Sequence, residues 1–373
     1  MRLLLLSASA GAGHVRAAQA LEEAFKKTRP DLEVRHEDIL DFTTGAYKKA
    51  YVGSFLAMAN HAPALWGYLY AESDEVKERR VRDRFMRFFN KLEFARFRRF
   101  VREYAPDAVL STHFLTAQVY GPRRRTGRDS FPLALAVTDF DVHAYWVEPT
   151  IDRYFVASDE LKARLSGRGI PAERIAVTGI PIASSFSRRW DRGPVFEKHS
   201  LSRELPSVLL MGGGAGVGTL EEAARAILQA GPLQLLAVCG RNEELRGRIA
   251  SLPVPAGSVV KAFGFVDPIA ELMAVADVAV TKSGGLTTSE CLAMGVPLIV
   301  RDPIPGQEDR NCDFVLEAGA GLKAYGPESL SFKLSGLLRD PARLKRMREA
   351  ARQAGRPRAA EQIAAAMMVS SGT

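Results

Sequence analysis

Cysteine is scarce in this sequence, which has three cysteines among 373 residues. Cys239, Cys291 and Cys312 show neither the even pairing of a disulfide framework nor the ligand spacing of a zinc site. This usage is typical of a protein that folds in a reducing compartment. The sequence therefore favours the cytosol, and we expect no structural metal.

A convincing membrane-spanning segment is also missing. Residues 1–6 are too short for the apolar core of a signal peptide and run directly into a glycine turn, so we interpret them as a buried strand. Residues 51–71 carry no Asp, Glu, Lys or Arg and are long enough to span a bilayer. Asn60, His61 and Pro63 stand at the centre of that stretch, where a spanning helix tolerates them poorly. We expect no transmembrane helix.

The composition is that of an ordinary globular protein, 47% hydrophobic and 25% charged, and the chain is long enough for two domains with full cores. The formal net charge of +8 predicts attraction to an anionic partner. Nucleic acid, an acidic membrane and a diphosphate ligand all remain possible at this point.

Two segments combine a buried apolar strand, a glycine turn and a helix with apolar residues at helical spacing. Residues 3–14 (LLLLSASAGAGH) precede one such helix, and residues 207–218 (SVLLMGGGAGVG) precede the other. Alternating strands and helices follow both segments, which predicts an α/β protein with two doubly wound parallel sheets. We expect domains at 1–180 and 207–345, a linker at 181–206, and a C-terminal helix and tail at 346–373.

Nicotinamide dinucleotides are a poor match to these glycine turns. The first turn has Arg16 where the third glycine of the fingerprint belongs. The strand that follows the second turn leads to Gly240, Arg241 and Asn242, and lacks the carboxylate that would hold an adenosine ribose. Dinucleotide binding is therefore disfavoured.

Residues 281–311 (TKSGGLTTSECLAMGVPLIVRDPIPGQEDRN) are the most informative segment. Its glycines, Gly284 and Gly285, stand between a strand and a helix, where free N–H groups bind anions and glycine lets a diphosphate approach. Glu290, further along that helix, is suited to accept both hydroxyls of a ribose. The polar loop at 303–311 then offers side chains for sugar hydroxyls. This order of groups indicates a nucleotide-sugar site, although an ordinary βαβ unit would also contain such a turn.

Residues 284–300 and 303–311 resemble the C-terminal half of the diacylglycerol glycosyltransferases. This group includes monogalactosyldiacylglycerol synthase and the processive diacylglycerol glucosyltransferases, and is related to the peptidoglycan enzyme that adds N-acetylglucosamine to lipid I. The similarity extends to SASAGAGHVRAA at 7–18, VTDFDVHAYW at 137–146 and the segment 263–285. It implies the GT-B fold, in which two Rossmann-like domains face each other across a cleft. The N-terminal domain would bind the acceptor and the membrane, and the C-terminal domain the UDP-sugar.

The resemblance also implies an acceptor site. His14 matches the histidine of the family's glycine turn, although Ala12 replaces a glycine common there. At a helix start His14 should stay neutral and able to accept a proton. Asp139 would orient this base, and metal binding by the Asp139–Asp141 pair is an alternative for those carboxylates. The implied acceptor or lipid contacts are Gly13, His143 and Trp146, and a core role for Trp146 is the competing interpretation.

The donor site implied by the resemblance lies in the second domain. Phe265 and Val266 would border the uracil, and Asn311 would support the sugar-binding loop. The helix N-termini and glycine amides would stabilise the departing diphosphate, so that no metal or other cofactor is obligatory beyond the UDP-sugar co-substrate. The full set of donor residues is Gly213, Gly214, Phe265, Val266, Ser283, Gly284, Gly285, Glu290, Gln307 and Glu308.

Between residues 75 and 103 there are eleven Lys or Arg residues and five Asp or Glu residues, with apolar residues at helical spacing. One interpretation is a helix that packs its Phe face on the core and leaves its basic face in solvent. The other adds that this segment and residues 51–71 meet an anionic membrane. A nucleic-acid partner is not expected, because the aromatic residues here follow helical spacing instead of an exposed groove.

These features predict an inverting glycosyltransferase, peripheral on the cytoplasmic face of the membrane, that moves a hexose from a UDP-sugar to a lipid hydroxyl. Diacylglycerol is the favoured acceptor, and another lipid such as lipid I is the first alternative. A UDP-sugar 2-epimerase of the same fold is the second alternative, and a basic nucleic-acid-binding protein is the third. The identity of the sugar, the number of sugars added and the oligomeric state stay open.

Overall fold

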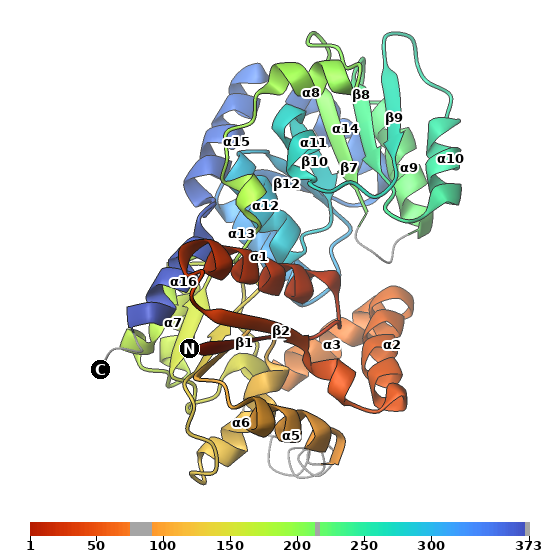
Figure 1. Ribbon diagram of the computed structural model, residues 1–373. Helices are drawn as coiled ribbons and strands as arrows, with labels where there is room; N and C mark the ends of the chain where they lie inside the picture. The colour runs from red at the N-terminus through yellow and green to blue at the C-terminus, as the bar shows by residue number, and fades with distance from the viewer. Residues whose placement is uncertain (75–91, 213–216, 370–373) are drawn as a thin grey trace. The chain divides into compact units, whose positions relative to one another are not determined.

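The computed structural model describes residues 1–74, 92–212 and 217–369. The chain divides into two compact units (Figure 1). Unit 1 comprises Met1–Ser184, Pro305–Gln307 and Arg358–Thr373. Unit 2 comprises Ser185–Ile304 and Glu308–Pro357.

Unit 1 is built on a six-stranded sheet in which each strand pairs in parallel with its neighbours. The strand order is β2-β1-β3-β4-β5-β6. Its central strands are fully buried apolar runs, as expected for a parallel sheet covered on both faces. The strands are β1 (Arg2–Ser7), β2 (Glu33–Asp38), β3 (Ala108–Ser111), β4 (Leu133–Ala136), β5 (Arg153–Val156) and β6 (Ile175–Val177).

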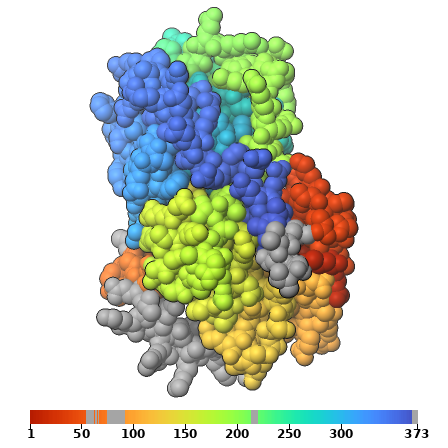
Figure 2. Space-filling view, turned by 90° about the vertical axis from the view of Figure 1, so that its left-hand side faces the viewer, coloured from red at the N-terminus to blue at the C-terminus, as the bar shows by residue number. Residues whose placement is uncertain are grey.

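Helices cover this sheet, and one of them comes from the far end of the chain. α16 (Ala359–Val369) packs against α1 (Ala12–Thr28), and Ile363 and Ala364 enter the same apolar core as Leu21 and Phe25. Figure 2 shows this blue segment beside the red N-terminal one. The other helices of unit 1 are α2 (Gly45–His61), α3 (Pro63–Asp74), α5 (Ala95–Tyr104), α6 (Leu115–Arg124) and α7 (Asp159–Gly167).

The strand order places a topological switch point between β1 and β3. From β1 the chain passes to β2 on one side and then returns to β3 on the other. The connections that follow β1 and β3 therefore lead to opposite sides of the sheet. In sheets of this kind, ligands bind at the carboxyl ends of the two strands at the switch point. The turn before α1 and the segment after β3 both lie at this edge.

Unit 2 repeats the plan with the order β12-β11-β10-β7-β8-β9, and its switch point lies between β7 and β10. The strands are β7 (Ser207–Met211), β8 (Gln234–Val238), β9 (Val259–Phe263), β10 (Val278–Thr281), β11 (Leu298–Arg301) and β12 (Gly321–Ala324). The helices are α8 (Arg192–Lys198), α9 (Val217–Leu228), α10 (Glu243–Ala250), α11 (Ala270–Val275), α12 (Gly285–Met294), α13 (Gln307–Glu317), α14 (Gly326–Leu338) and α15 (Pro341–Ala354).

The C-terminal segment forms two helices where one was expected from the sequence. α15 packs on α12 in unit 2, and α16 belongs to unit 1. Gly355 stands between the two helices, and a Cβ atom at this position would lie 2.5 Å from the carbonyl oxygen of Leu292. Only glycine fits there without a shift of the backbone, so the end of α15 is held tightly against α12.

The uncharged stretch at 51–71 is divided between α2 and α3, which are separated just before Pro63. Within the described parts of the chain, no helix has both the length and the apolar character needed to cross a membrane. Most of the basic segment, residues 75–91, lies outside the described residues. In α5, Phe97 and Val101 are buried while Arg96 and Arg99 are exposed, which confirms a helix with a packed apolar face and a solvated basic face.

Candidate active site

His14 lies in the first turn of α1, directly after the glycine turn that ends β1. Its Nδ1 is 2.9 Å from the carbonyl oxygen of Thr112, the residue that follows β3. The hydroxyl of Thr112 in turn donates to the carbonyl oxygen of His14 at 2.8 Å. The two strand ends of the switch point are thereby joined through His14.

These contacts decide which nitrogen of His14 carries the proton. A carbonyl oxygen can only accept a hydrogen bond, so Nδ1 must be the donor to Thr112. The hydroxyl of Thr138, after β4, also lies 2.9 Å from Nδ1. In the neutral ring Nε2 then carries the lone pair. Nε2 is therefore the atom at which the neutral ring of His14 can accept a proton.

The surroundings of His14 also keep it neutral. Burial lowers its pKa below the ordinary 6.5, while the charge of Asp139 and the hydrogen bond with Thr112 act to raise it. The ring of His113 meets it edge-on, with centroids 4.5 Å apart. Burial is the main reason that the pKa of His113 lies well below 6.5, and its neighbour His14 lowers this pKa further. Both imidazoles are thus uncharged near neutral pH.

Asp139 was expected to orient the base, and this role stays a prediction. Thr112 and Thr138 hold the Nδ1 side of the ring, and Asp139 acts on His14 through its charge. Within unit 1, Gln307 Nε2 donates to Asp139 Oδ1 at 2.6 Å. A carboxylate near the ring stabilises the imidazolium that forms after proton transfer.

The rest of the 137–146 segment is firmly packed. His143 is buried, and its Nε2 lies 3.1 Å from the carbonyl oxygen of Tyr70. Trp146 is 3% exposed and packs near the rings of His113 and Phe114. This burial favours the core interpretation of Trp146 over direct contact with a lipid.

Metal binding by the Asp139–Asp141 pair is disfavoured by its neighbours. Arg164 Nη1 lies 2.6 Å from Asp141 Oδ1, and the Asp141 side chain is almost fully buried. Across the described residues, no group of three or more His, Cys, Asp or Glu side chains is placed to hold a metal ion.

In unit 2 the corresponding position is taken by the start of α12. Gly284 is the N-cap of this helix, and the space where its Cβ would stand is open. The N–H groups of the first helical turn have no partner within the helix and attract an anion. Ser283 donates its hydroxyl to the carbonyl oxygen of Glu308 at 2.6 Å, so that this helix start is tied to α13.

Polar groups at the start of α13 hold the loop that precedes this helix and the turn at Ser283. Glu308 Oε2 accepts from the N–H of Ile304 at 2.8 Å. Asn311 is fully buried and donates from Nδ2 to the carbonyl oxygen of Ser283 at 2.9 Å. Glu290 is buried on α12, 4% exposed. Glu290 lies on the same helix as the Gly284 N-cap.

The other donor residues are placed less tightly. Phe265 is 64% exposed, just beyond β9, and Arg241 stands over its ring. Val266 is half-buried beside it. Gly213 and Gly214 lie outside the described residues.

Sequence reasoning missed the groups that hold His14 and the 137–146 segment. Thr112 and Thr138 each follow a strand of the same parallel sheet, and that position alone was a usable signal. Ser73, Asp74 and Arg168, whose hydrogen bonds reach the 139–146 segment or one another, gave no local signal, because these contacts join distant parts of the chain.

The chain is similar to known proteins over most of its length. Residues 14–182 match the family model of monogalactosyldiacylglycerol (MGDG) synthase, and residues 207–363 match the glycosyltransferase family 28 C-terminal domain. A processive diacylglycerol beta-glucosyltransferase of Bacillus cereus (strain AH187) is 33% identical over 371 residues, which is 97% of this chain and 92% of that protein. This chain belongs to the diacylglycerol glucosyltransferase family. A family member of the same name from Bacillus anthracis is 32% identical over the same share of both chains.

Solved structures show the fold of this family member to be GT-B. The crystal structure of Acinetobacter baumannii MurG matches with a TM-score of 0.65 over 99% of both chains, at 16% identity. The UDP-GlcNAc 2-epimerase of Neisseria meningitidis, bound to UDP-GlcNAc, matches with a TM-score of 0.61 over 99% of this chain and 100% of that one, at 13% identity.

The first prediction concerns the pH dependence of His14. Only the neutral ring accepts a proton, and burial lowers its pKa. The acid limb of kcat/KM should therefore fall below pH 6.5, with a level rate near pH 7. Replacing His14→Ala should lower kcat by ~10²–10⁴ and leave UDP affinity unchanged. His199→Gln, in unit 2, serves as the histidine control. A His14→Ala enzyme with the rate and pH profile of the parent would contradict the assignment.

The second prediction concerns Glu290. Glu290→Gln keeps the side-chain volume but removes the charge that strengthens hydrogen bonds to ribose hydroxyls. The loss should be about 1.5–3 kcal/mol, roughly a tenfold to hundredfold weaker affinity for UDP by calorimetry. Glu328→Gln, on the exposed first turn of α14, is the control. Unchanged UDP affinity would show that Glu290 points away from the nucleotide.

Proposed function

We propose that this protein is an inverting glycosyltransferase that moves a hexose from a UDP-sugar to the free hydroxyl of diacylglycerol. The observation that carries this is His14, a neutral histidine at the switch point of unit 1, with its proton fixed on Nδ1 by Thr112. It is supported by similarity over nearly the whole chain to a processive diacylglycerol beta-glucosyltransferase. UDP-glucose is accordingly the first donor to test.

In this reaction the Nε2 lone pair of His14 takes the proton of the acceptor hydroxyl. The acceptor oxygen attacks the anomeric carbon of the sugar, the bond from that carbon to the UDP oxygen breaks, and the configuration inverts. A hydroxyl is a weak nucleophile at neutral pH, so a positioned base contributes ~10²–10⁴ to the rate. The negative charge of Asp139 stabilises the imidazolium that results.

Unit 2 would bind the donor. The N-terminus of α12, open at Gly284, suits the diphosphate both before and after the bond breaks. Glu290 would accept the ribose hydroxyls. Gln307 and Glu308 would contact the hexose, with Ser283 and Asn311 fixing their loop. In this proposal the leaving charge is stabilised by helix N–H groups, and a metal is not obligatory.

The two enzyme alternatives have different support. The 2-epimerases share the fold at 13% identity, a level that informs on fold alone. The relatives at 32–33% identity are named for transfer to diacylglycerol. Transfer to another lipid, such as lipid I, remains the second candidate, and the likeness to MurG at 16% identity likewise informs on fold alone.

We also propose peripheral attachment to the cytoplasmic face of an anionic membrane. α3 exposes Leu65, Tyr68 and Leu69, and the chain continues from it into the basic segment at 75–103. Apolar side chains that enter the interface and basic residues that meet anionic headgroups together give reversible attachment. The lipid acceptor requires the enzyme to work at such a surface.

The third prediction tests the reaction itself. Labelled UDP-glucose, UDP-galactose, UDP-glucuronate and UDP-N-acetylglucosamine are incubated with the protein and dispersed diacylglycerol, and the lipid products are resolved. We expect glycosyldiacylglycerol of inverted configuration, and no sugar-nucleotide isomer when lipid is omitted. Isomerisation of the sugar nucleotide without acceptor would favour an epimerase. A product formed on lipid I, but not on diacylglycerol, would show that lipid I is the acceptor.

The fourth prediction tests the membrane. Vesicle sedimentation should show binding that rises with anionic lipid and falls with salt, because each basic residue near the surface contributes ~1 kcal/mol. Replacing Arg79, Arg80 and Arg82 by glutamate should weaken it. Phe332→Ser, at an exposed apolar residue of unit 2, is the control. Equal binding to neutral and anionic vesicles would rule out an electrostatic contribution to membrane attachment.

A further inference from the structure

Helix α3 carries three exposed apolar residues. Leu65, Tyr68 and Leu69 are 53%, 61% and 43% exposed and lie three and four residues apart, on one face of the helix. A helix on the surface of a globular protein normally turns such a face toward the core. Burial of these three side chains therefore contributes little to holding α3 in place, and other contacts must do so.

The inward face of α3 carries polar contacts to the segment 139–146. His143 Nδ1 accepts from the N–H of Tyr145 at 3.1 Å, so the proton of this ring is on Nε2. Nε2 donates to the carbonyl oxygen of Tyr70, and the hydroxyl of Ser73 lies 3.1 Å from the same nitrogen. The rings of Tyr70 and His143 also touch, with centroids 4.5 Å apart.

The last residue of α3 completes this attachment. Arg168, which caps α7, donates from Nη1 and Nη2 to the two carboxylate oxygens of Asp74 at 2.7 and 2.8 Å. The N–H of Ala144 donates to Asp74 Oδ1 at 2.7 Å. Both charged side chains are about four-fifths buried. A paired, charge-assisted bond of this kind is stronger and more directional than a single bond between neutral groups.

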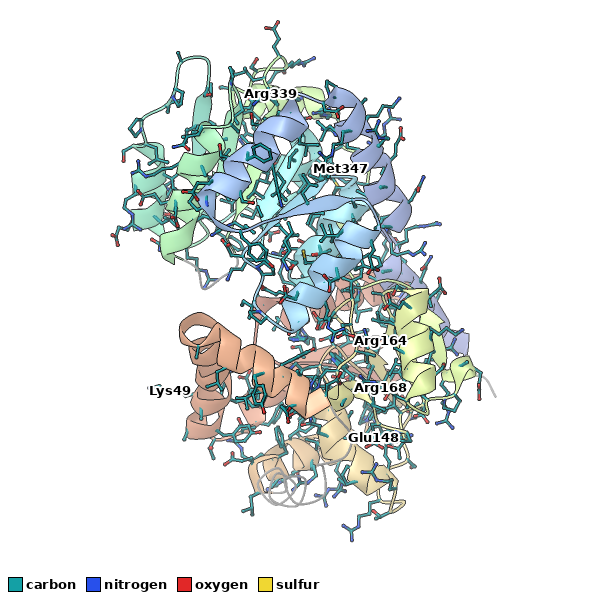
Figure 3. The ribbon with its side chains drawn as sticks, turned by 180° about the vertical axis from the view of Figure 1, so that it is seen from behind. Lys49, Glu148, Arg164, Arg168, Arg339 and Met347 are labelled. Carbon is teal, nitrogen blue, oxygen red and sulfur yellow. The ribbon has the colours of Figure 1, made fainter. Side chains whose placement is uncertain are left out.

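A second arginine of α7 also contacts the 139–146 segment. Arg164, one helical turn before Arg168, pairs with the buried Asp141. Figure 3 shows both arginines extending from α7 into unit 1. Burial alone would raise the pKa of Asp74, but the hydrogen bonds from Arg168 and Ala144 outweigh it and keep the pKa below its ordinary value. The carboxylate is therefore charged at neutral pH.

We propose that the Asp74–Arg168 pair is a positioning clamp that fixes α3, with its outward apolar face, to the segment 139–146 beside His14. Asp139 begins that segment, and its charge already acts on His14. The helix that meets the lipid and the surroundings of the base are thereby kept in one geometry. The inference rests on the proposed function, since it is the lipid acceptor that α3 would meet.

The clamp predicts a separation of kinetic constants. In mixed micelles, Arg168→Met and Asp74→Asn should raise the apparent KM for diacylglycerol by ~10-fold, because α3 must then be ordered as the acceptor binds, without the charged hydrogen bonds that hold it in the parent. The Kd for UDP, a property of unit 2, should not change. Arg168→Lys keeps the charge but not the paired geometry and should recover part of the loss. Glu160→Gln, exposed on α7, is the control.

A second measurement separates the clamp from the proposed reaction. Hydrogen exchange of peptides covering 63–74 and 139–146 should quicken in Arg168→Met, while peptides from β1 and β3 keep their protection. Unchanged exchange in α3, or an unchanged KM for the acceptor in an enzyme that makes glycolipid, would overturn the clamp. If the parent protein makes no glycolipid, the proposed function fails, and exchange alone still decides whether the pair holds α3.

Discussion

The strands of each sheet run parallel to their neighbours, and this constraint decides where the chemistry of the molecule gathers. Parallel strands have all their carboxyl ends at one edge, so the residues just after them meet there whatever their separation in sequence. His14, Thr112 and Thr138 follow three different strands, and both threonines still come within hydrogen-bond distance of His14. In unit 2 the same rule brings the turn at Ser283 to the switch point beside β7.

The sequence was most informative where function depends on position along a strand or helix. The glycine turns after β1 and β7, the helix after Gly284 and the two-sheet plan all follow from local patterns, and the structure confirms the fold. The contact between His14 and the carbonyl oxygen of Thr112 was not foreseen, because sequence letters do not report backbone acceptors. Nor do they reveal Asp74 and Arg168, which stand 94 positions apart and meet only after folding.

His14 and Asp74 illustrate two ways in which a polar side chain is buried. His14 loses hydration and stays uncharged, a state that costs little because a carbonyl oxygen satisfies its one N–H. Asp74 keeps its charge, and that is tolerable only because Arg168 and Ala144 supply three hydrogen bonds. The burial of His14 leaves a lone pair that can accept a proton. The burial of Asp74 leaves a hydrogen-bonded ion pair.

The contribution of α16 to the core of unit 1 bears on how the chain folds as it is synthesised. Ile363 and Ala364 complete an apolar cluster that begins with Leu3 and Leu5. When residues 1–184 have left the ribosome, that cluster still lacks one of its walls. Unit 2 must be made before the missing helix arrives, so the N-terminal unit is the first to start folding and the last to finish. Until then its unfinished face is a natural target for chaperones, and nonsense mutations late in the gene would damage the beginning of the protein.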